Sequence, residues 1–340
     1  MKVVAIGGGT GLSAVLRGLK LYVDEAARPA TFQPAISRLT AVVTVTDEGG
    51  SSGRLRRDLR ILPPGDIRNC LVALAEDETL IAQLFKYRFA GGRGLKGHSL
   101  GNLLLAALTH LTQDFAQAVR LSSEVLAIRG EILPSTLADV RLQALLRDGR
   151  VLAGESRISK TRVPIRRLRI VPSRCRPLPE TLVAIEEADL ITLGPGSLYT
   201  SLIPNLLVGG IPQAIAGSKA LKVYVGNLVT QPGETSGYTA ADHLHALHQH
   251  ARRKLFDLMI LNGADLSPAL RKRYAAQRAE PVLNDIEEVW AQGVEPILVD
   301  LLVEDRVARH DSVRLAQLLI DLVTHRTPPS QQPVRAPARR

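Results

Sequence analysis

The chain has 340 residues, of which 45% are hydrophobic and 22% charged, a composition that is typical of a globular protein and excludes disorder over most of the length. Aromatic residues make up only 4%, too few for the stacking surface that binds single-stranded nucleic acid, so we expect no nucleic-acid partner. The net charge of +10 favours anionic partners, small phosphorylated ligands among them.

Cysteine content and hydropathy predict a cytoplasmic protein. Cys70 and Cys175 are the only cysteines, which is too few for a disulfide framework and fits a reducing compartment. The first apolar run, Val3–Ile6, is not preceded by the charged and apolar regions of a signal peptide. Because no apolar run approaches the roughly 18–20 residues of a membrane span, we expect none.

Short apolar strands alternate with helical periodicity, which predicts a mainly parallel sheet covered by helices. The first strand is Val3–Ile6, the second is Thr40–Thr46, and helices follow each of them. We interpret Asp66 as the cap of one such helix. After an interruption the pattern resumes, and it predicts the strands Leu190–Leu193, Lys222–Gly226, Leu258–Leu261 and Leu298–Val303. The fold class is therefore α/β, a Rossmann-like three-layer sandwich.

Residues 125–180 interrupt this pattern. Their short β-branched runs predict an insertion with antiparallel strands, with one helix at Leu137–Leu146. Arginines crowd the stretch Arg162–Arg176, which we interpret as a solvated face. We expect residues 1–325 to form a single domain and residues 326–340, rich in Pro, Gln, Ser and Arg, to be a disordered tail.

Two glycine-rich turns follow strands and open helices, an arrangement that binds phosphate through free backbone N–H groups. The first turn does not match the dinucleotide fingerprint, because Leu12 stands where that pattern needs glycine. It does not match the P-loop either, because it lacks the Gly-Lys-Ser/Thr ending. The second turn, at a helix start, is the predicted diphosphate seat. Their candidate ligand-binding residues are Gly8, Gly9, Thr10, Gly11 and Leu12 in the first, and Gly194, Gly196, Ser197 and Tyr199 in the second.

Four further segments add polar candidates. A loop after the second strand carries Asp47, a candidate for Mg²⁺ or a sugar hydroxyl, and a glycine-serine run that would cradle an anion. His98, in another glycine-rich loop, is a candidate general acid or base together with Asp47. The remaining candidate ligand-binding residues are Gly50, Ser51, Ser52, Arg54, Arg68, Asn69, Asn102, Lys219, Asn227, Thr230, Gln231 and Glu234. The histidine-rich stretch from Asp242 to His250 has no H-E-x-x-H pattern, so we expect no zinc site there.

Taken together, six ordered motifs closely resemble the YvcK-type gluconeogenesis factor family, relatives of the 2-phospho-L-lactate transferase CofD. The motifs are GGGTGL (7–12), TVTDEGGSSGRLR (44–56), PPGDIRNCL (63–71), GHSLGNL (97–103), LGPGSLYTSLIPNLLV (193–208) and NLVTQPGET (227–235). The resemblance implies a CofD-like fold, cytoplasmic location, binding of UDP-sugars such as UDP-N-acetylglucosamine, and a role in cell shape and wall synthesis on gluconeogenic carbon sources. The family usually carries two adjacent aspartates where this chain has Asp47-Glu48.

Three functions stay open on the sequence. The first is a regulatory binder of a nucleotide-sugar that requires no cofactor, with Mg²⁺ as an alternative. The second is a CofD-like transferase that moves a phospholactyl-type group from a nucleotide diphosphate donor to an acceptor hydroxyl, and the third is an NAD-binding protein. A homo-oligomer and a protein partner in cell-wall synthesis also remain open.

Overall fold

The computed structural model describes residues 1–23, 35–76 and 79–325, so the predicted tail, residues 326–340, lies outside the described residues. The main sheet is built from Lys2–Gly7 (β1), Arg38–Val43 (β2), Glu131–Pro134 (β3), Leu190–Leu193 (β7), Leu221–Val225 (β8), Leu258–Asn262 (β9) and Glu295–Val299 (β10). These seven strands are all parallel and lie in the order β10-β9-β8-β7-β1-β2-β3. The predicted α/β class is confirmed.

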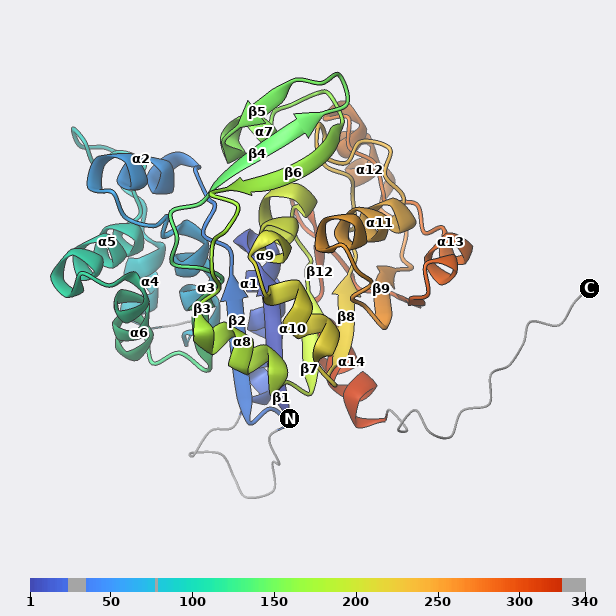
Figure 1. Cartoon of the computed structure of the whole chain (residues 1–340), viewed down its shortest axis with the longest axis horizontal. Helices are drawn as coiled ribbons and strands as arrows, with labels where there is room; N and C mark the ends of the chain where they lie inside the picture. Colours follow the sequence, from blue (N-terminus) through green and yellow to red (C-terminus); the bar gives the residue numbers. More distant parts are fainter. Residues whose placement is uncertain (24–34, 77–78, 326–340) are drawn as a thin grey trace, which may run out of the picture.

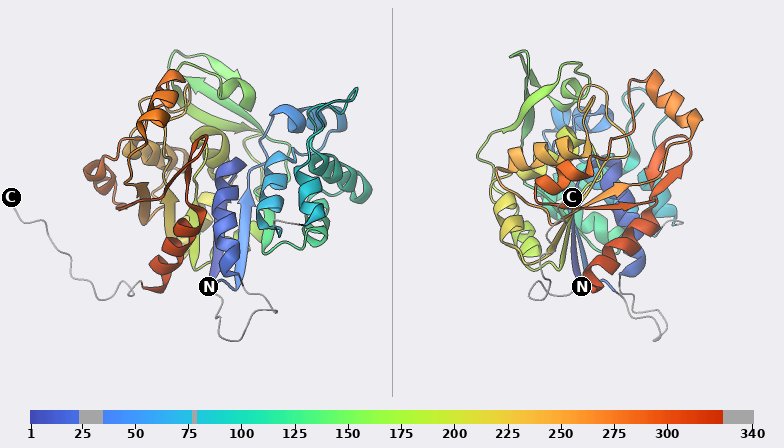
Figure 2. Two further views of the ribbon diagram at one scale, coloured as in Figure 1. Left: turned by 180° about the vertical axis from the view of Figure 1, so that it is seen from behind. Right: turned by 90° about the vertical axis from the view of Figure 1, so that its right-hand side faces the viewer.

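Helices cover both faces of the sheet, as the views from the front and the back show (Figures 1 and 2). One face carries α1 (Gly9–Leu19), α3 (Gly65–Leu74) and α14 (Ser312–Thr324); the other carries α8 (Pro179–Glu186), α9 (Ile203–Leu207) and α10 (Ile211–Gly217). The helices beside β3 are α2 (Gly50–Leu59), α4 (Leu80–Lys86), α5 (Leu100–Thr112) and α6 (Phe115–Val125). Those on the β9 side are α11 (Ala240–Ala251), α12 (Pro268–Ala276) and α13 (Ile286–Ala291).

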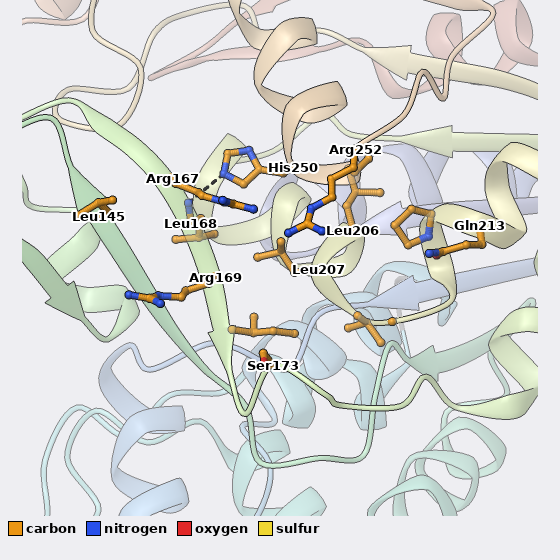
Figure 3. Close-up of a pocket in the computed structure, with 15 residues that line it drawn as sticks. Leu145, Arg167, Leu168, Arg169, Ser173, Leu206, Leu207, Gln213, His250 and Arg252 are labelled. Atoms are coloured by element: carbon orange, nitrogen blue, oxygen red, sulfur yellow. Dashed lines mark hydrogen bonds between the residues drawn. The ribbon is translucent and has the colours of Figure 1, made fainter.

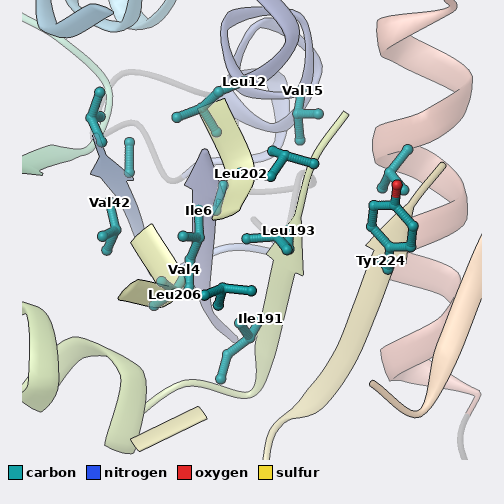
Figure 4. Close-up of a cluster of buried hydrophobic side chains, with 14 of the residues drawn as sticks. Val4, Ile6, Leu12, Val15, Val42, Ile191, Leu193, Leu202, Leu206 and Tyr224 are labelled. Carbon is teal, nitrogen blue, oxygen red and sulfur yellow. The ribbon is translucent and has the colours of Figure 1, made fainter. Parts of the chain in front are cut away.

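The core lies on both sides of the central strands. Ile6, Leu193 and Leu202 are at most 1% exposed and pack together with Leu12 from α1 (Figure 4). Strands that are buried on both faces need apolar residues at nearly every position, which is why the strand sequences read as continuous apolar runs. None of the helices that the structure describes is both long and apolar enough to span a bilayer.

A separate antiparallel sheet lies above the carboxyl ends of the main strands (Figure 1). It consists of Arg141–Leu146 (β4), Val151–Ala153 (β5) and Ile165–Val171 (β6) in the order β5-β4-β6, with the short helix α7 (Glu155–Ile158). The predicted strand-rich insertion is therefore present, although β3 before it belongs to the main sheet.

The helix predicted at Leu137–Leu146 is wrong, because its second half is the strand β4. Leu142, Ala144 and Leu146 are buried while the residues between them are not, which is the period of two of a half-buried strand. The strand predicted at Leu298–Val303 is also divided, between the end of β10 and the start of a hairpin formed by β11 (Leu302–Glu304) and β12 (Ala308–His310).

The order of the strands reverses between β1 and β7. From β1 the chain builds outward through β2 and β3, whereas from β7 it builds in the opposite direction through β8, β9 and β10. At such a topological switch point the loops after the two central strands leave in opposite directions, and a crevice opens at the carboxyl edge of the sheet. The loops in question begin at Gly7 and Gly194.

The contact between α1 and α14 gives a stability prediction. A Cβ atom on Gly18 would overlap the carbonyl oxygen of Ser312 at the start of α14, so we expect Gly18→Ala to lower the free energy of unfolding by about 1–3 kcal/mol. Gly217→Ala is the matched control, because a Cβ at that helical position meets nothing within 4 Å and should be neutral or slightly stabilising. Chemical denaturation of both variants measures the difference; equal stabilities would contradict the packing described here.

Candidate functional site

The two predicted phosphate loops touch each other at the switch point. A Cβ atom on Gly11 would overlap the carbonyl oxygen of Pro195, so only glycine allows this approach. Asn205, in α9, donates from Nδ2 to the carbonyl oxygen of Gly7 at 3.1 Å and to that of Ser201 at 2.8 Å. One amide side chain thus joins the end of β1 to the turn that follows β7.

The loop after β8 also reaches this crevice. Asn227 Nδ2 donates to the carbonyl oxygen of Gly196 at 3.0 Å. Glu234 Oε2 accepts from the Ser197 hydroxyl at 2.6 Å and from the Tyr199 N–H at 3.4 Å. A carboxylate of the protein itself therefore lies at the helix start (η2, Leu198–Leu202) that we predicted as the diphosphate seat. Burial raises the pKa of Glu234, and the Ser197 hydroxyl opposes this.

A second carboxylate lies at the first glycine turn. The carboxyl group of Asp66 would meet a Cβ placed on Gly8, and it accepts a hydrogen bond from the backbone of Gly9. Our interpretation of Asp66 as a helix cap is wrong: α3 begins at Gly65, its N-cap position is Pro64, and Asp66 is in the first turn. Each glycine turn therefore already carries a carboxylate of the protein where an anion would bind.

Asp66 belongs to a group of acidic side chains that includes Asp47 and Glu155. Burial, and then the negative charge of Asp47, raise the pKa of Asp66 to about 7. The same two causes raise the pKa of Glu155 to about 8, although Glu155 Oε2 accepts a 2.6 Å hydrogen bond from the Glu48 N–H. Arg68 is the nearby cation that favours the ionised form of Asp66. Burial is thus the main reason that Asp66 and Glu155 keep their protons to a higher pH, and the charge of Asp47 adds to it.

The sequence analysis missed both Asp66 and Glu155 as site residues. The sequence signal for Asp66 was its place in the motif PPGDIRNCL, next to the candidates Arg68 and Asn69. Glu155 gave no such signal, because it lies in the insertion, more than 100 residues from Glu48.

Three predicted residues, Ser51 in α2, His98 just before α5 and Asn102 in α5, form one hydrogen-bonded group. The Ser51 hydroxyl lies 2.9 Å from His98 Nδ1, and Asn102 Nδ2 donates to the same hydroxyl at 3.1 Å. Burial, followed by the charge of Arg54, lowers the pKa of His98, so the imidazole is neutral at physiological pH. The Arg54 guanidinium donates to the carbonyl oxygen of Lys96 at 2.8 Å, which connects α2 to the loop that carries His98.

Several predicted residues end in buried polar atoms that have no partner among the residues the structure describes. They are Arg68 Nε, Asn102 Oδ1, Asn227 Oδ1 and Gln231 Oε1. Buried polar groups usually have a hydrogen-bond partner, so these four atoms, which come from α3, α5 and the loop after β8, have hydrogen-bonding capacity that the described residues do not use. The Arg68 guanidinium also donates to Asn69 Oδ1 at 2.6 Å, which places Asn69 beside it.

The structure also separates some candidates from the crevice. Lys219 lies two residues before the start of β8, at the amino edge of the parallel sheet and therefore opposite the crevice, so we remove it from the candidate site. The Leu12 side chain is fully buried in the core, and its N–H donates to the carbonyl oxygen of Gly8. Thr230 is 2% exposed and its hydroxyl accepts from the Glu280 N–H at 3.0 Å, which is a structural role.

The remaining candidates lie at the border of the crevice. Thr10 and Gly50 are exposed at the first turns of α1 and α2. The Tyr199 hydroxyl lies 2.8 Å from that of Tyr238, and both rings line a neighbouring cavity of about 430 Å³. Among the described residues, no group of three or more His, Cys, Asp or Glu side chains is arranged to hold a metal ion, and that includes the histidine-rich helix α11.

A parallel sheet whose strand order reverses between two touching glycine turns defines a Rossmann-like α/β protein. The family model of the 2-phospho-L-lactate transferase CofD matches residues 3–302, and the chain belongs to this family. A gluconeogenesis factor from Bacillus subtilis is 48% identical over 323 residues, which are 95% of this chain and 98% of that one. A putative gluconeogenesis factor from a Nostoc species is 50% identical over 322 residues, 94% of this chain and 68% of that one.

Solved structures agree with this assignment. An X-ray structure of a protein from Bacillus halodurans superimposes with a TM-score of 0.88 at 46% identity, covering 94% of this chain and 99% of that one. The family resemblance and the fold that the six motifs predicted are both confirmed.

The raised pKa of Asp66 predicts a pH-dependent effect on stability. A carboxyl group whose pKa rises from roughly 3.9 in the unfolded chain to about 7 in the folded one makes the protein less stable as the pH increases between these values. Asp66→Asn keeps an acceptor for the Gly9 N–H and removes this ionisation. We expect it to raise the Tm by about 2–4 °C at pH 8 and by less than about 1 °C at pH 5.

Thermal denaturation at the two pH values measures this difference. Asp305→Asn, a change of an exposed carboxyl group, is the control and should shift the Tm equally little at both. A gain for Asp66→Asn that is the same at pH 5 and pH 8 would show that Asp66 is not held neutral in the folded protein.

Proposed function

We propose that this protein is a cytoplasmic regulatory protein that binds a nucleotide-sugar, a UDP-sugar such as UDP-N-acetylglucosamine, and acts as a gluconeogenesis factor in cell shape and wall synthesis. The names of the relatives support the gluconeogenic role, while uridine, the sugar and the cell-wall role rest on the resemblance of the six motifs. The observation that carries the ligand class is the group of unpartnered buried polar atoms around the switch-point crevice.

The identities of these atoms support a ligand with many hydroxyl and amide groups. Asn102, Asn227 and Gln231 each leave a carbonyl oxygen free, and such oxygens accept hydrogen bonds from sugar hydroxyls or from the N–H of a base. Asn102 is in the first turn of α5, and Asn227 and Gln231 are in the loop after β8. A ligand that bridges them would have a sugar or base on either side of a central anionic part, as a nucleotide-sugar has.

The carboxylates of Asp47 and Asp66 favour Mg²⁺ as part of the complex. Asp47 and Asp66 raise each other's energy when both are ionised, and a diphosphate would add further negative charge. Mg²⁺ is commonly held by one or two carboxylates together with substrate phosphates and water, so these two side chains fit it without a third protein ligand. The ion would neutralise the diphosphate next to the acidic group.

One observation favours the transferase alternative as well. Asp66 and Glu155, with pKa values of about 7 and about 8, lie in the range where a carboxyl group exchanges a proton near neutral pH, and the CofD family match supports phospholactyl-type transfer to an acceptor hydroxyl. For NAD, in contrast, the first glycine turn lacks the glycine that the dinucleotide fingerprint needs at Leu12.

Calorimetric titration with UDP-N-acetylglucosamine, UDP-glucose, GDP and NAD, each with and without Mg²⁺, tests the proposal. We expect micromolar binding of a UDP-sugar that strengthens with Mg²⁺. Thr10→Val removes an exposed hydroxyl at the first turn of α1 without changing the size of the side chain, so it should weaken binding by about tenfold and leave the Tm unchanged.

The same titrations distinguish the alternatives. Micromolar binding of NAD without binding of any UDP-sugar would contradict the proposed ligand class. Steady consumption of a nucleotide diphosphate donor in the presence of an acceptor would replace the regulatory function with the transferase. Unchanged affinity in Thr10→Val would show that the phosphates do not bind at the first glycine turn.

A further inference from the structure

One cavity has no role in the proposed function. It has a volume of about 550 Å³ and lies between strand β6, the turn from α9 to α10, and the end of α11 (Figure 3). Its size is within the range of small-molecule sites. None of the candidate residues of the crevice lines it, so the proposed nucleotide-sugar site does not account for it.

Three arginines line this cavity, Arg167 and Arg169 from β6 and Arg252 at the end of α11, and two of them face each other. The guanidinium groups of Arg167, from β6, and Arg252, at the end of α11, point toward each other above Leu207 (Figure 3). Among the residues that the structure describes, neither side chain has an ion pair or a hydrogen bond, and no Asp or Glu lines the cavity. Two like charges that converge without a counter-charge destabilise each other, and an anion bound between them would offset this.

The floor of the cavity is apolar. Leu206, Leu207 and Pro212 contribute to it from the turn between α9 and α10. A hydrated inorganic ion would leave this surface unused, whereas an organic group attached to the anion would bury it and gain free energy. Site shape and charge together therefore select a small amphipathic anion rather than a free ion.

An extended peptide is less well suited to the same place. Strand β6 is an edge of the small sheet, and a peptide could add to it only through free backbone groups. The Leu168 N–H in the middle of β6 already donates to His250 Nε2 at 2.9 Å, and His250 Nδ1 is bonded to the carbonyl oxygen of Ala246 at 2.7 Å (Figure 3). His250 therefore occupies the backbone N–H of Leu168, which an added peptide strand would need.

From the convergence of Arg167 and Arg252 above an apolar floor we infer that this cavity binds a phosphate monoester with an apolar body. The dianionic phosphate lies between the two guanidinium groups, each of which donates two hydrogen bonds to such a group, and the organic part lies on Leu206, Leu207 and Pro212. The occupant contacts α9, the helix whose Asn205 holds the carbonyl oxygens of Gly7 and Ser201, but it does not enter the crevice.

Titration calorimetry with 1-naphthyl phosphate as the probe tests this site. Arg252→Gly removes one guanidinium at a residue whose φ of 56° suits glycine, so the fold should be kept, and Arg167→Gln removes the other. We expect each variant to bind the probe about tenfold more weakly or worse. The neutral alcohol 1-naphthol and inorganic phosphate alone should both bind more weakly than the ester.

Two control variants test whether the probe binds in this cavity. Arg166→Gln changes the neighbouring arginine of the same strand, which lines the other cavity, and Thr10→Val changes the crevice; both should bind the probe like the unmodified protein. The site is refuted if Arg252→Gly and Arg167→Gln bind the probe unchanged, or if 1-naphthol binds as tightly as the ester. It is also refuted if an acidic peptide binds through these arginines while the probe does not.

Discussion

The close approach of Gly11 to the carbonyl group of Pro195 is the constraint on which the site depends. Strands β1 and β7 are neighbours in the sheet, so the turns that follow them must share one small volume. A side chain at Gly11 would overlap the Pro195 backbone and force the two turns to separate. Because Gly11 has no Cβ, the backbones meet, and Asn205 can bond to both Gly7 and Ser201 at once.

The charges in the crevice follow from this compact geometry. Backbone N–H groups at the two turns are potential anion sites, and in the structure they are satisfied by Asp66 and by Glu234. A phosphate that enters must therefore compete with carboxylates, bring a cation, or bind while they are protonated. Burial, and after it the charge of Asp47, raises the pKa values of Asp66 and Glu155, and Arg68 opposes the shift of Asp66 only in part. A ligand that binds beside these groups would therefore change their protonation or bring a metal ion with it.

The sequence predicted the sheet and the loops well because both depend on local patterns. Apolar strands and glycine turns are visible in short windows, and parallel topology then brings their carboxyl ends to one edge. Prediction from the sequence failed where two patterns fit the same residues, or where the two residues in contact are far apart in the sequence. The apolar residues of Leu137–Leu146 fit both a helical and an alternating period. The segment forms a strand because it pairs with β6. Lys219 has suitable chemistry, but its position before β8 places it at the wrong edge. The contact of Glu155 with Glu48 depends on how the insertion folds over the sheet.

The arginine-rich stretch shows how one strand can serve two environments. Leu168 and Ile170 of β6 are buried, whereas Arg166, Arg167 and Arg169 are exposed, so composition alone correctly suggested a charged face. A solvated face, however, separates its like charges, and here Arg167 is opposed by Arg252 from a different element, above leucines of α9 (Figure 3). Thus α9 has an acidic crevice near its beginning, where Asn205 anchors the glycine turns, and a basic cavity near its end, at Leu207. The carboxyl groups at the first have pKa values of about 7 and about 8, so their charge changes near neutral pH. The arginines at the second stay charged and attract an anion at any physiological pH.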